Sequence, residues 1–173
     1  MRDMDIKERA LAGALGGFAG TFVLSGLRWA LASMGTVFTT APEQVVGRAE
    51  ELGLLHRFSP GAKKALVVAA HFLYGTAVGA TFGALRREYE EPESDTAAEL
   101  QGNRDDAPTE AAVGAALGVL SWGAGWAVWL PIVGVHPAPW TQKSPRALLP
   151  VLDHAVFGAA WGLIYWLLSR RRA

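Results

Sequence analysis

Four ionisable side chains lie inside long apolar stretches of the sequence: Arg28, His71, Asp153 and His154. Ionisable groups at membrane depth are costly, so they usually pair with one another or serve a function. Arg28 lies about one turn from the end of its stretch and Asp153 under two turns from the start of its own, so we predict that the two pair across neighbouring helices. We weigh three roles for the histidines: neutral rings that hydrogen-bond between helices, a polar relay or solute pathway that includes Asp153, and axial ligation of haem b. Asp153 and His154 are neighbours in the chain and point to different sides of a helix, which disfavours a zinc site, and no metal is predicted.

Both histidines begin the same nine-residue pattern, His-x-x-aromatic-Gly-x-x-x-Gly, which runs over residues 71–79 and again over 154–162. On a helix, residues four apart share one face, so each copy places a stripe of glycines below its histidine. Small residues at this spacing allow close helix contacts in lipid. The following residues are therefore the predicted helix-packing positions: Gly75, Gly79, Gly83, Gly158 and Gly162.

Familiar catalytic patterns are absent from the sequence. It contains no Gly-x-Ser-x-Gly, no phosphate-binding loop that ends in Gly-Lys-Ser/Thr, and no His-Glu-x-x-His. It has no cysteine, which excludes thiol chemistry and Cys-ligated metals. The net charge of +0 offers no attraction to nucleic acid. We therefore expect neither enzymatic activity nor a nucleic-acid partner.

The four ionisable residues must be positioned by long apolar helices. Hydrophobic residues make up 51% of the chain and charged residues 18%, against about 25% charged in soluble domains. A helix needs about 20 apolar residues to cross a bilayer. The apolar stretches are long enough, and they lack the polar face of long helices in a soluble bundle. The predicted fold is an all-α, polytopic membrane protein with one domain, 1–173, and four transmembrane helices, at about 10–31, 65–85, 111–133 and 147–168.

The repeated histidine pattern predicts that these helices form a tandem repeat of two helix pairs. A cleaved signal peptide at the start is disfavoured, because Asp3, Asp5 and Glu8 spoil the basic segment that such peptides carry. The Trp and Gly residues of the third stretch are typical of packing and lipid contact.

Two further segments lie between the predicted spans. Thr40 and Glu43 have the spacing of a capping box, with Pro42 between them, and Val45 begins an apolar face. We predict a short amphipathic helix on the membrane surface, with a lid over a cavity as the alternative. Residues 88–110 are acidic, lack apolar periodicity and are predicted to form a flexible cytoplasmic loop.

Four spans place both termini and the 88–110 loop on one side of the membrane. Apart from Arg28, that side carries nine Lys and Arg residues against six on the other. The positive-inside rule then predicts that both termini are cytoplasmic, in a multi-pass protein of the cell inner membrane.

The order of features resembles the YagU-like family of uncharacterised four-helix inner-membrane proteins. The features are a Gly-rich span, a Pro-Glu surface helix, His71-x-x-Tyr74-Gly75-x-x-x-Gly79, a Trp/Gly-rich span, a Pro-rich loop and Asp153-His154-x-x-Phe157-Gly158. The resemblance covers nearly the whole chain and implies a bacterial or archaeal cytoplasmic membrane. It implies no catalytic residues.

Three classes of function remain open on the sequence. The abundance of glycine stripes favours a structural or accessory membrane protein, which packs against a second copy or within a larger membrane complex. The alternatives are a small carrier or channel that uses the buried His, Asp and Arg residues, and a haem-binding membrane protein. The lipid bilayer is the expected partner in every case.

Overall fold

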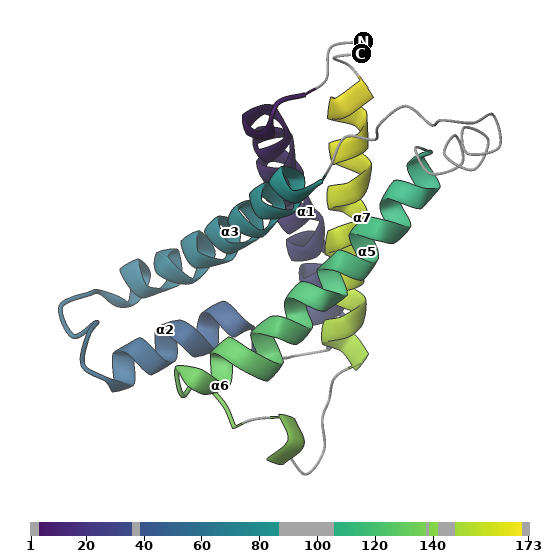
Figure 1. Ribbon diagram of the computed structural model, residues 1–173. Helices are drawn as coiled ribbons and strands as arrows, with labels where there is room; N and C mark the ends of the chain where they lie inside the picture. Colours follow the sequence, from purple (N-terminus) through teal and green to yellow (C-terminus); the bar gives the residue numbers. More distant parts are fainter. Residues whose placement is uncertain (1–3, 36–38, 87–105, 138, 142–147, 171–173) are drawn as a thin grey trace, which may run out of the picture.

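The structure, a computed structural model, describes residues 4–35, 39–86, 106–137, 139–141 and 148–170. Over these residues it consists of helices and turns, without a strand (Figure 1). The elements are α1 (Ile6–Ser33), α2 (Ala41–Glu51), α3 (Pro60–Leu85), α5 (Ala107–Ala124), the π-helical segment η1 (Gly125–Trp129), α6 (Leu130–Ile132), the 3₁₀ turn η2 (Pro139–Thr141) and α7 (Leu148–Arg170).

Among the described residues, four helical runs are long and apolar enough to cross a membrane, as predicted: α1, α3, the continuous run of α5, η1 and α6, and α7. Helix α1 has 28 residues and is therefore about 42 Å long at 1.5 Å per residue, more than the roughly 30 Å of a bilayer core. The protein is thus an all-helical, multi-pass membrane protein. The third run begins at Ala107, so the end of the predicted 88–110 loop is helical. Residues 88–105 lie outside the described residues.

Side-chain caps define where several helices begin. The predicted capping box of Thr40 and Glu43 starts α2, and Asp5 with Glu8 forms another at the start of α1. Asp106 caps α5, where its Oδ1 accepts from the Thr109 backbone N–H at 2.8 Å. Hydrogen bonds from the side chain and backbone of Thr109 lower the pKa of the Asp106 carboxyl.

The four long helices pack in a row, in the order α3, α1, α7, α5. The extensive contacts join α1 to α3, α1 to α7 and α5 to α7, whereas α3 and α5 hardly touch. The two outer helices therefore diverge from the central pair, as Figure 1 shows. The start of α1 and the end of α7 lie at the same end of the molecule (Figure 1), as an even number of spans requires.

Glycines form the contacts between each outer helix and its inner neighbour. A Cβ on Gly79 of α3 would lie 2.8 Å from the Gly17 Cα and would overlap the Gly13 carbonyl oxygen. A Cβ on Gly158 of α7 would lie 3.0 Å from the Gly118 Cα of α5. These neighbours are backbone atoms, which cannot turn aside as a flexible side chain can, so only glycine permits such close helix contact.

Large aromatic residues fill the interface between the two inner helices. Trp161 of α7 is fully buried, and its Nε1 donates to the Gly13 carbonyl oxygen at 3.0 Å. It occupies space that Gly16 leaves open, because a Cβ on Gly16 would lie 2.9 Å from the Trp161 Cδ1. Tyr165 and Phe82 pack against the same ring, at centroid distances of 5.4 and 5.6 Å. This cluster forms the core of the bundle.

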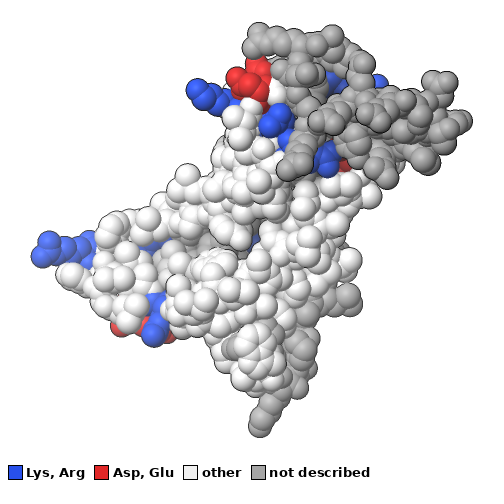
Figure 2. All heavy atoms as spheres, in the orientation of Figure 1, with Lys and Arg blue, Asp and Glu red and all other residues white. Residues whose placement is uncertain are grey.

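Charged side chains gather at two ends of the molecule, and the surface between them is largely uncharged (Figure 2). At one end an ion pair between Arg86 and Glu110 links α3 to α5. At the other end Lys63 and Glu50 link α3 to α2. The uncharged belt is the surface that a membrane-spanning protein presents to hydrocarbon.

Candidate functional site

A cavity of about 620 Å³ lies where the outer helices diverge. It is bounded by α1, α2, α3, the α5–η1–α6 run and α7, so every long helix contributes to its wall. All four ionisable residues singled out in the sequence line it, although they come from three helices: Arg28, His71, Asp153 and His154. The volume lies within the roughly 300–1,000 Å³ of small-molecule sites. This cavity is the candidate functional site.

Arg28 and Asp153 form an ion pair between α1 and α7. The Arg28 Nε donates to the Asp153 Oδ2 at 2.9 Å, and the two side chains are 17% and 2% exposed. The predicted pairing of these two residues is therefore present in the structure. Removing one member of a buried pair costs about 3–5 kcal/mol, because the other charge is left without compensation. The pair thus fixes α1 against α7 beside the cavity.

His154 has a defined tautomer when it is neutral. Its Nδ1 lies 2.7 Å from the Pro150 carbonyl oxygen of the preceding turn. A carbonyl oxygen only accepts, so Nδ1 must carry the hydrogen and Nε2 keeps its lone pair. Pro150 lies in the first turn of α7. Backbone N–H groups in a first turn have no partner within the helix, so the N–H that proline lacks removes no helix hydrogen bond. The His154 ring also lies 6.5 Å from that of Trp122.

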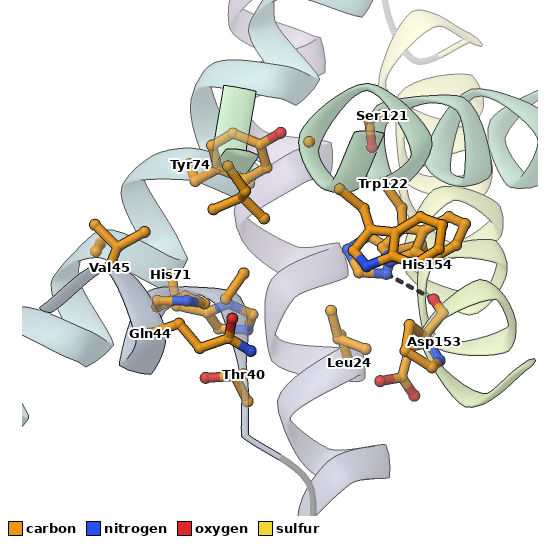
Figure 3. A pocket seen from close by; sticks show the side chains of 18 of the residues that line it. Leu24, Thr40, Gln44, Val45, His71, Tyr74, Ser121, Trp122, Asp153 and His154 are labelled. Carbon is orange, nitrogen blue, oxygen red and sulfur yellow. Dashed lines mark hydrogen bonds between the residues drawn. The ribbon is translucent and has the colours of Figure 1, made fainter. Parts of the chain in front are cut away.

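His71 faces His154 from the other side of the cavity (Figure 3). Its ring contacts Phe72 edge-on, with centroids 6.0 Å apart. Among the described residues, none forms a hydrogen bond with either ring nitrogen of His71. The His71 ring is half-buried and lines the cavity. His71 is therefore ready to bind a polar group that enters the cavity.

Aromatic side chains form much of the remaining wall. Trp122 and Trp126 stack with their centroids 5.0 Å apart, and Trp129 lies 6.1 Å from Tyr74 across the cavity. The sequence interpretation assigned these tryptophans to packing and lipid contact; the structure places Trp122, Trp126 and Trp129 at the cavity. Tyr74 was noted only as the aromatic member of the repeated motif.

A π-helical segment supports this aromatic wall. Over Gly125–Trp129 the helix widens, and the Leu130 N–H bonds to the Gly125 carbonyl oxygen five residues earlier. Pro131 follows directly, and a proline ring clashes with the carbonyl of an α-helical turn below it. Widening of that turn relieves the clash. Such π-bulges are frequent at functional sites.

His136, in the turn after α6, was not predicted as a site residue. Its Nδ1 donates to the Pro137 carbonyl oxygen at 2.8 Å, and its Nε2 is buried without a hydrogen-bond partner among the described residues. Both His136 and Pro137 line the cavity. The only signal in the sequence was a histidine beside a Pro-rich loop.

Helix α2 covers part of the cavity. Thr40, Gln44 and Val45 line it near His71 (Figure 3). The ion pair between Lys63 and Glu50 holds α2 against α3. This arrangement matches the lid alternative for the predicted amphipathic helix; its position on a membrane surface remains a prediction.

In the part of the chain that the structure describes, no three His, Asp or Glu residues are close enough together to hold a metal ion. No family model, no curated protein and no solved structure matches the chain. The resemblance to the YagU-like proteins therefore rests on the sequence features alone. The fold and the site define the class, a four-helix membrane protein with a cavity among its spans.

Proposed function

We propose that this protein binds a small molecule in the cavity between its membrane helices, as a carrier or receptor. The observation that carries this proposal is the convergence of the paired Arg28 and Asp153 with His71 and His154 on one cavity of about 620 Å³. Apolar cavities with a few convergent polar groups are typical small-molecule sites. A purely structural helix bundle has no need for such a cavity.

The glycine stripes give less support to an accessory subunit than the sequence suggested. Gly79 and Gly83 contact α1, and Gly158 and Gly162 contact α5, all within the same chain. A partner protein is therefore not needed to explain them. The alternative of a small carrier becomes the preferred function.

We propose further that the two helix pairs are a tandem repeat. Gly75 of α3 lies against Gly17 of α1, and the equivalent Gly158 of α7 lies against Gly114 of α5. One turn further along, Gly79 of α3 meets Gly13 of α1, and Gly162 of α7 meets Glu110 of α5. In both pairs the partner residue lies four positions earlier on the neighbouring helix. The common register supports an internal duplication.

We also infer that the protein lies in a cell inner membrane with both ends in the cytoplasm. The start of α1 and the end of α7 share one end of the molecule (Figure 1). Arg86 and Arg170, at the ends of α3 and α7, belong to the more basic side of the topology.

Cavity-filling variants test the binding function. Ser121→Trp places an indole in the cavity wall, whereas Leu120→Trp, one position away on a residue that is 66% exposed, places it in lipid. Ala70→Trp and Val68→Trp form a second matched pair from α3. We expect native mass spectrometry to detect a retained small molecule with the wild type and both lipid-facing variants, and its loss from both cavity variants. Equal retention by all four variants would refute a function based on this cavity.

Haem binding is a second candidate, because His71 and His154 line the same cavity from opposite sides. Haem that is held by two axial histidines has a sharp Soret absorption band. The absorbance spectrum of the purified protein, before and after addition of haemin, tests this candidate. If haemin addition changes the spectrum of the wild type no more than that of variants without His71 or His154, haem binding is refuted.

A further inference from the structure

The charges around the cavity compensate one another. Arg28 is paired with Asp153, so the two formal charges at the cavity cancel. No other Asp, Glu, Lys or Arg among the described residues lines the cavity. A charged ligand would have to give up its hydration without finding an opposite net charge, which is costly in an apolar environment. The ligand should therefore be neutral.

The shape of the wall favours a flat ring. Trp122 and Trp126 stack at an interplanar angle of 13°, and Tyr74, Trp129 and Phe157 supply further aromatic surface. Aromatic faces bind planar π-systems through offset stacking and edge contacts, in addition to the apolar area that they bury. A branched or globular apolar molecule would not make use of this surface.

The hydrogen-bonding groups lie on opposite sides of the cavity. His154 offers the lone pair of its Nε2, while His71 has ring nitrogens that bond to none of the described residues. Figure 3 shows the two rings on either side of the cavity, with Tyr74 and Trp122 above them. A ring that carries oxygen atoms at two opposite edges can bond to both. One edge can donate a hydroxyl hydrogen to His154, and the other can accept from a His71 N–H.

The cavity opens towards the lipid. It lies between α3 and α5, which hardly touch, and Figure 2 shows a hollow within the uncharged surface between the two charged ends. A ligand that enters there arrives from the hydrocarbon phase. Its ring can occupy the cavity while an attached apolar chain stays between the outer helices.

We propose that the cavity binds the head group of a lipid-soluble quinone or its quinol. This inference rests on the binding function proposed above and names the chemical class of the ligand. A quinone is neutral, planar and soluble in the bilayer, and its oxygens lie at opposite edges of the ring. Reduction to the quinol changes an acceptor to a hydroxyl donor, which suits the lone pair on His154 Nε2.

Decylubiquinone, a short-chain benzoquinone, is the probe. It is titrated into the purified full-length protein in mild detergent, and binding is followed by quenching of tryptophan fluorescence, since Trp122 and Trp126 line the site. We expect saturable quenching. His71→Phe should bind decylubiquinone about tenfold more weakly, because it loses one hydrogen bond to a quinone oxygen, and His154→Phe should bind the reduced form, decylubiquinol, about tenfold more weakly, because it loses the acceptor for the quinol hydroxyl. His154→Gln, which keeps an acceptor, should recover most of the affinity.

His56→Phe is the matched control, because His56 is exposed, lies away from the cavity and makes a similar bond from its Nδ1 to the Gly53 carbonyl oxygen at 2.7 Å. Its affinity should equal that of the wild type. Thermal melting of each variant establishes that it is folded. Saturable quenching that is equal in the wild type, His71→Phe and His154→Phe would overturn the quinone assignment, as would non-saturable quenching.

Oleate and cholesterol, tested as competitors, distinguish this inference from the binding function itself. If Ser121→Trp loses a retained molecule that proves to be a fatty acid or a sterol, and decylubiquinone does not bind, the cavity still binds a ligand but the quinone class is wrong. If Ser121→Trp loses decylubiquinone binding while Leu120→Trp keeps it, both inferences are supported.

Discussion

The ion pair between Arg28 and Asp153 allows a quantitative test of how α1 is held against α7. Arg28→Met keeps the length of the side chain but removes its charge, and leaves the Asp153 carboxylate, 2% exposed, without its cation. The expected cost is about 3–5 kcal/mol. Because 1 kcal/mol shifts the melting temperature of a chain of this size by roughly 2–4 °C, the melting temperature should fall by about 10 °C. Asp153→Leu should cost less, since Arg28 is 17% exposed and can turn towards polar groups.

The double variant should be more stable than the sum of the two single losses predicts. With both charges replaced by apolar groups, no buried charge remains, and the coupling between the two sites should reach about 2 kcal/mol. Thermal unfolding in detergent, followed by circular dichroism, measures all four proteins of the cycle. The partly exposed pair of Lys63 and Glu50 is the control, where each single loss should stay below about 1 kcal/mol. Losses at Arg28 and Asp153 that add within about 0.5 kcal/mol would refute the reasoning.

Three further predictions follow from the packing, the topology and the caps. Gly79→Leu and Gly158→Leu should each destabilise the protein by about 3 kcal/mol because backbone atoms occupy the space, whereas Gly26→Leu, with nothing within 4 Å, should not; equal melting temperatures would mean that the stripes tolerate side chains. With cysteines introduced by Ser94→Cys or Thr141→Cys into this Cys-free chain, an impermeant thiol reagent added to intact cells should label position 141 alone, and labelling at position 94 would contradict cytoplasmic termini. The pKa of Asp106 is lower in the folded state, so its cap stabilises the fold above the unfolded pKa of about 3.9 and the contribution is lost as pH falls through the lowered value. Asp106→Ala should therefore lower the melting temperature at pH 7 and have little effect near pH 2; a pH-independent difference would show that the charge of the carboxylate is not involved.

The parts of the fold that depend on local pattern were predictable from the sequence. Runs without charge identify spans by length alone, and glycines at four-residue spacing identify the packing faces of α3 and α7. The pairing of Arg28 with Asp153 was predictable because few charges occur at membrane depth and both lie near the same end of their spans. Such inferences need no knowledge of the neighbouring helices.

The composition of the cavity could not be derived in this way. A tryptophan that faces lipid and one that faces a cavity follow the same helical spacing, so Trp122 and Trp126 carry no local sign of their role. His136 reaches the cavity only through the path of the turn after α6, which the sequence does not specify. The ion pair between Arg86 and Glu110 was missed because Glu110 was assigned to the loop, whereas α5 begins three residues before it.

The cavity follows from how unequally the four helices are joined. Glycine contacts hold each outer helix tightly against one inner helix, and Trp161 with its neighbours fills the space between the two inner helices. In the described part of the chain α3 and α5 share few contacts, and their ion pair, between Arg86 and Glu110, lies at the end away from the cavity. The helices therefore diverge away from that end, and the space between them is the cavity. Because the histidine precedes the glycine stripe in both copies of the motif, His71 and His154 lie at the cavity end of the helix pairs that the stripes join.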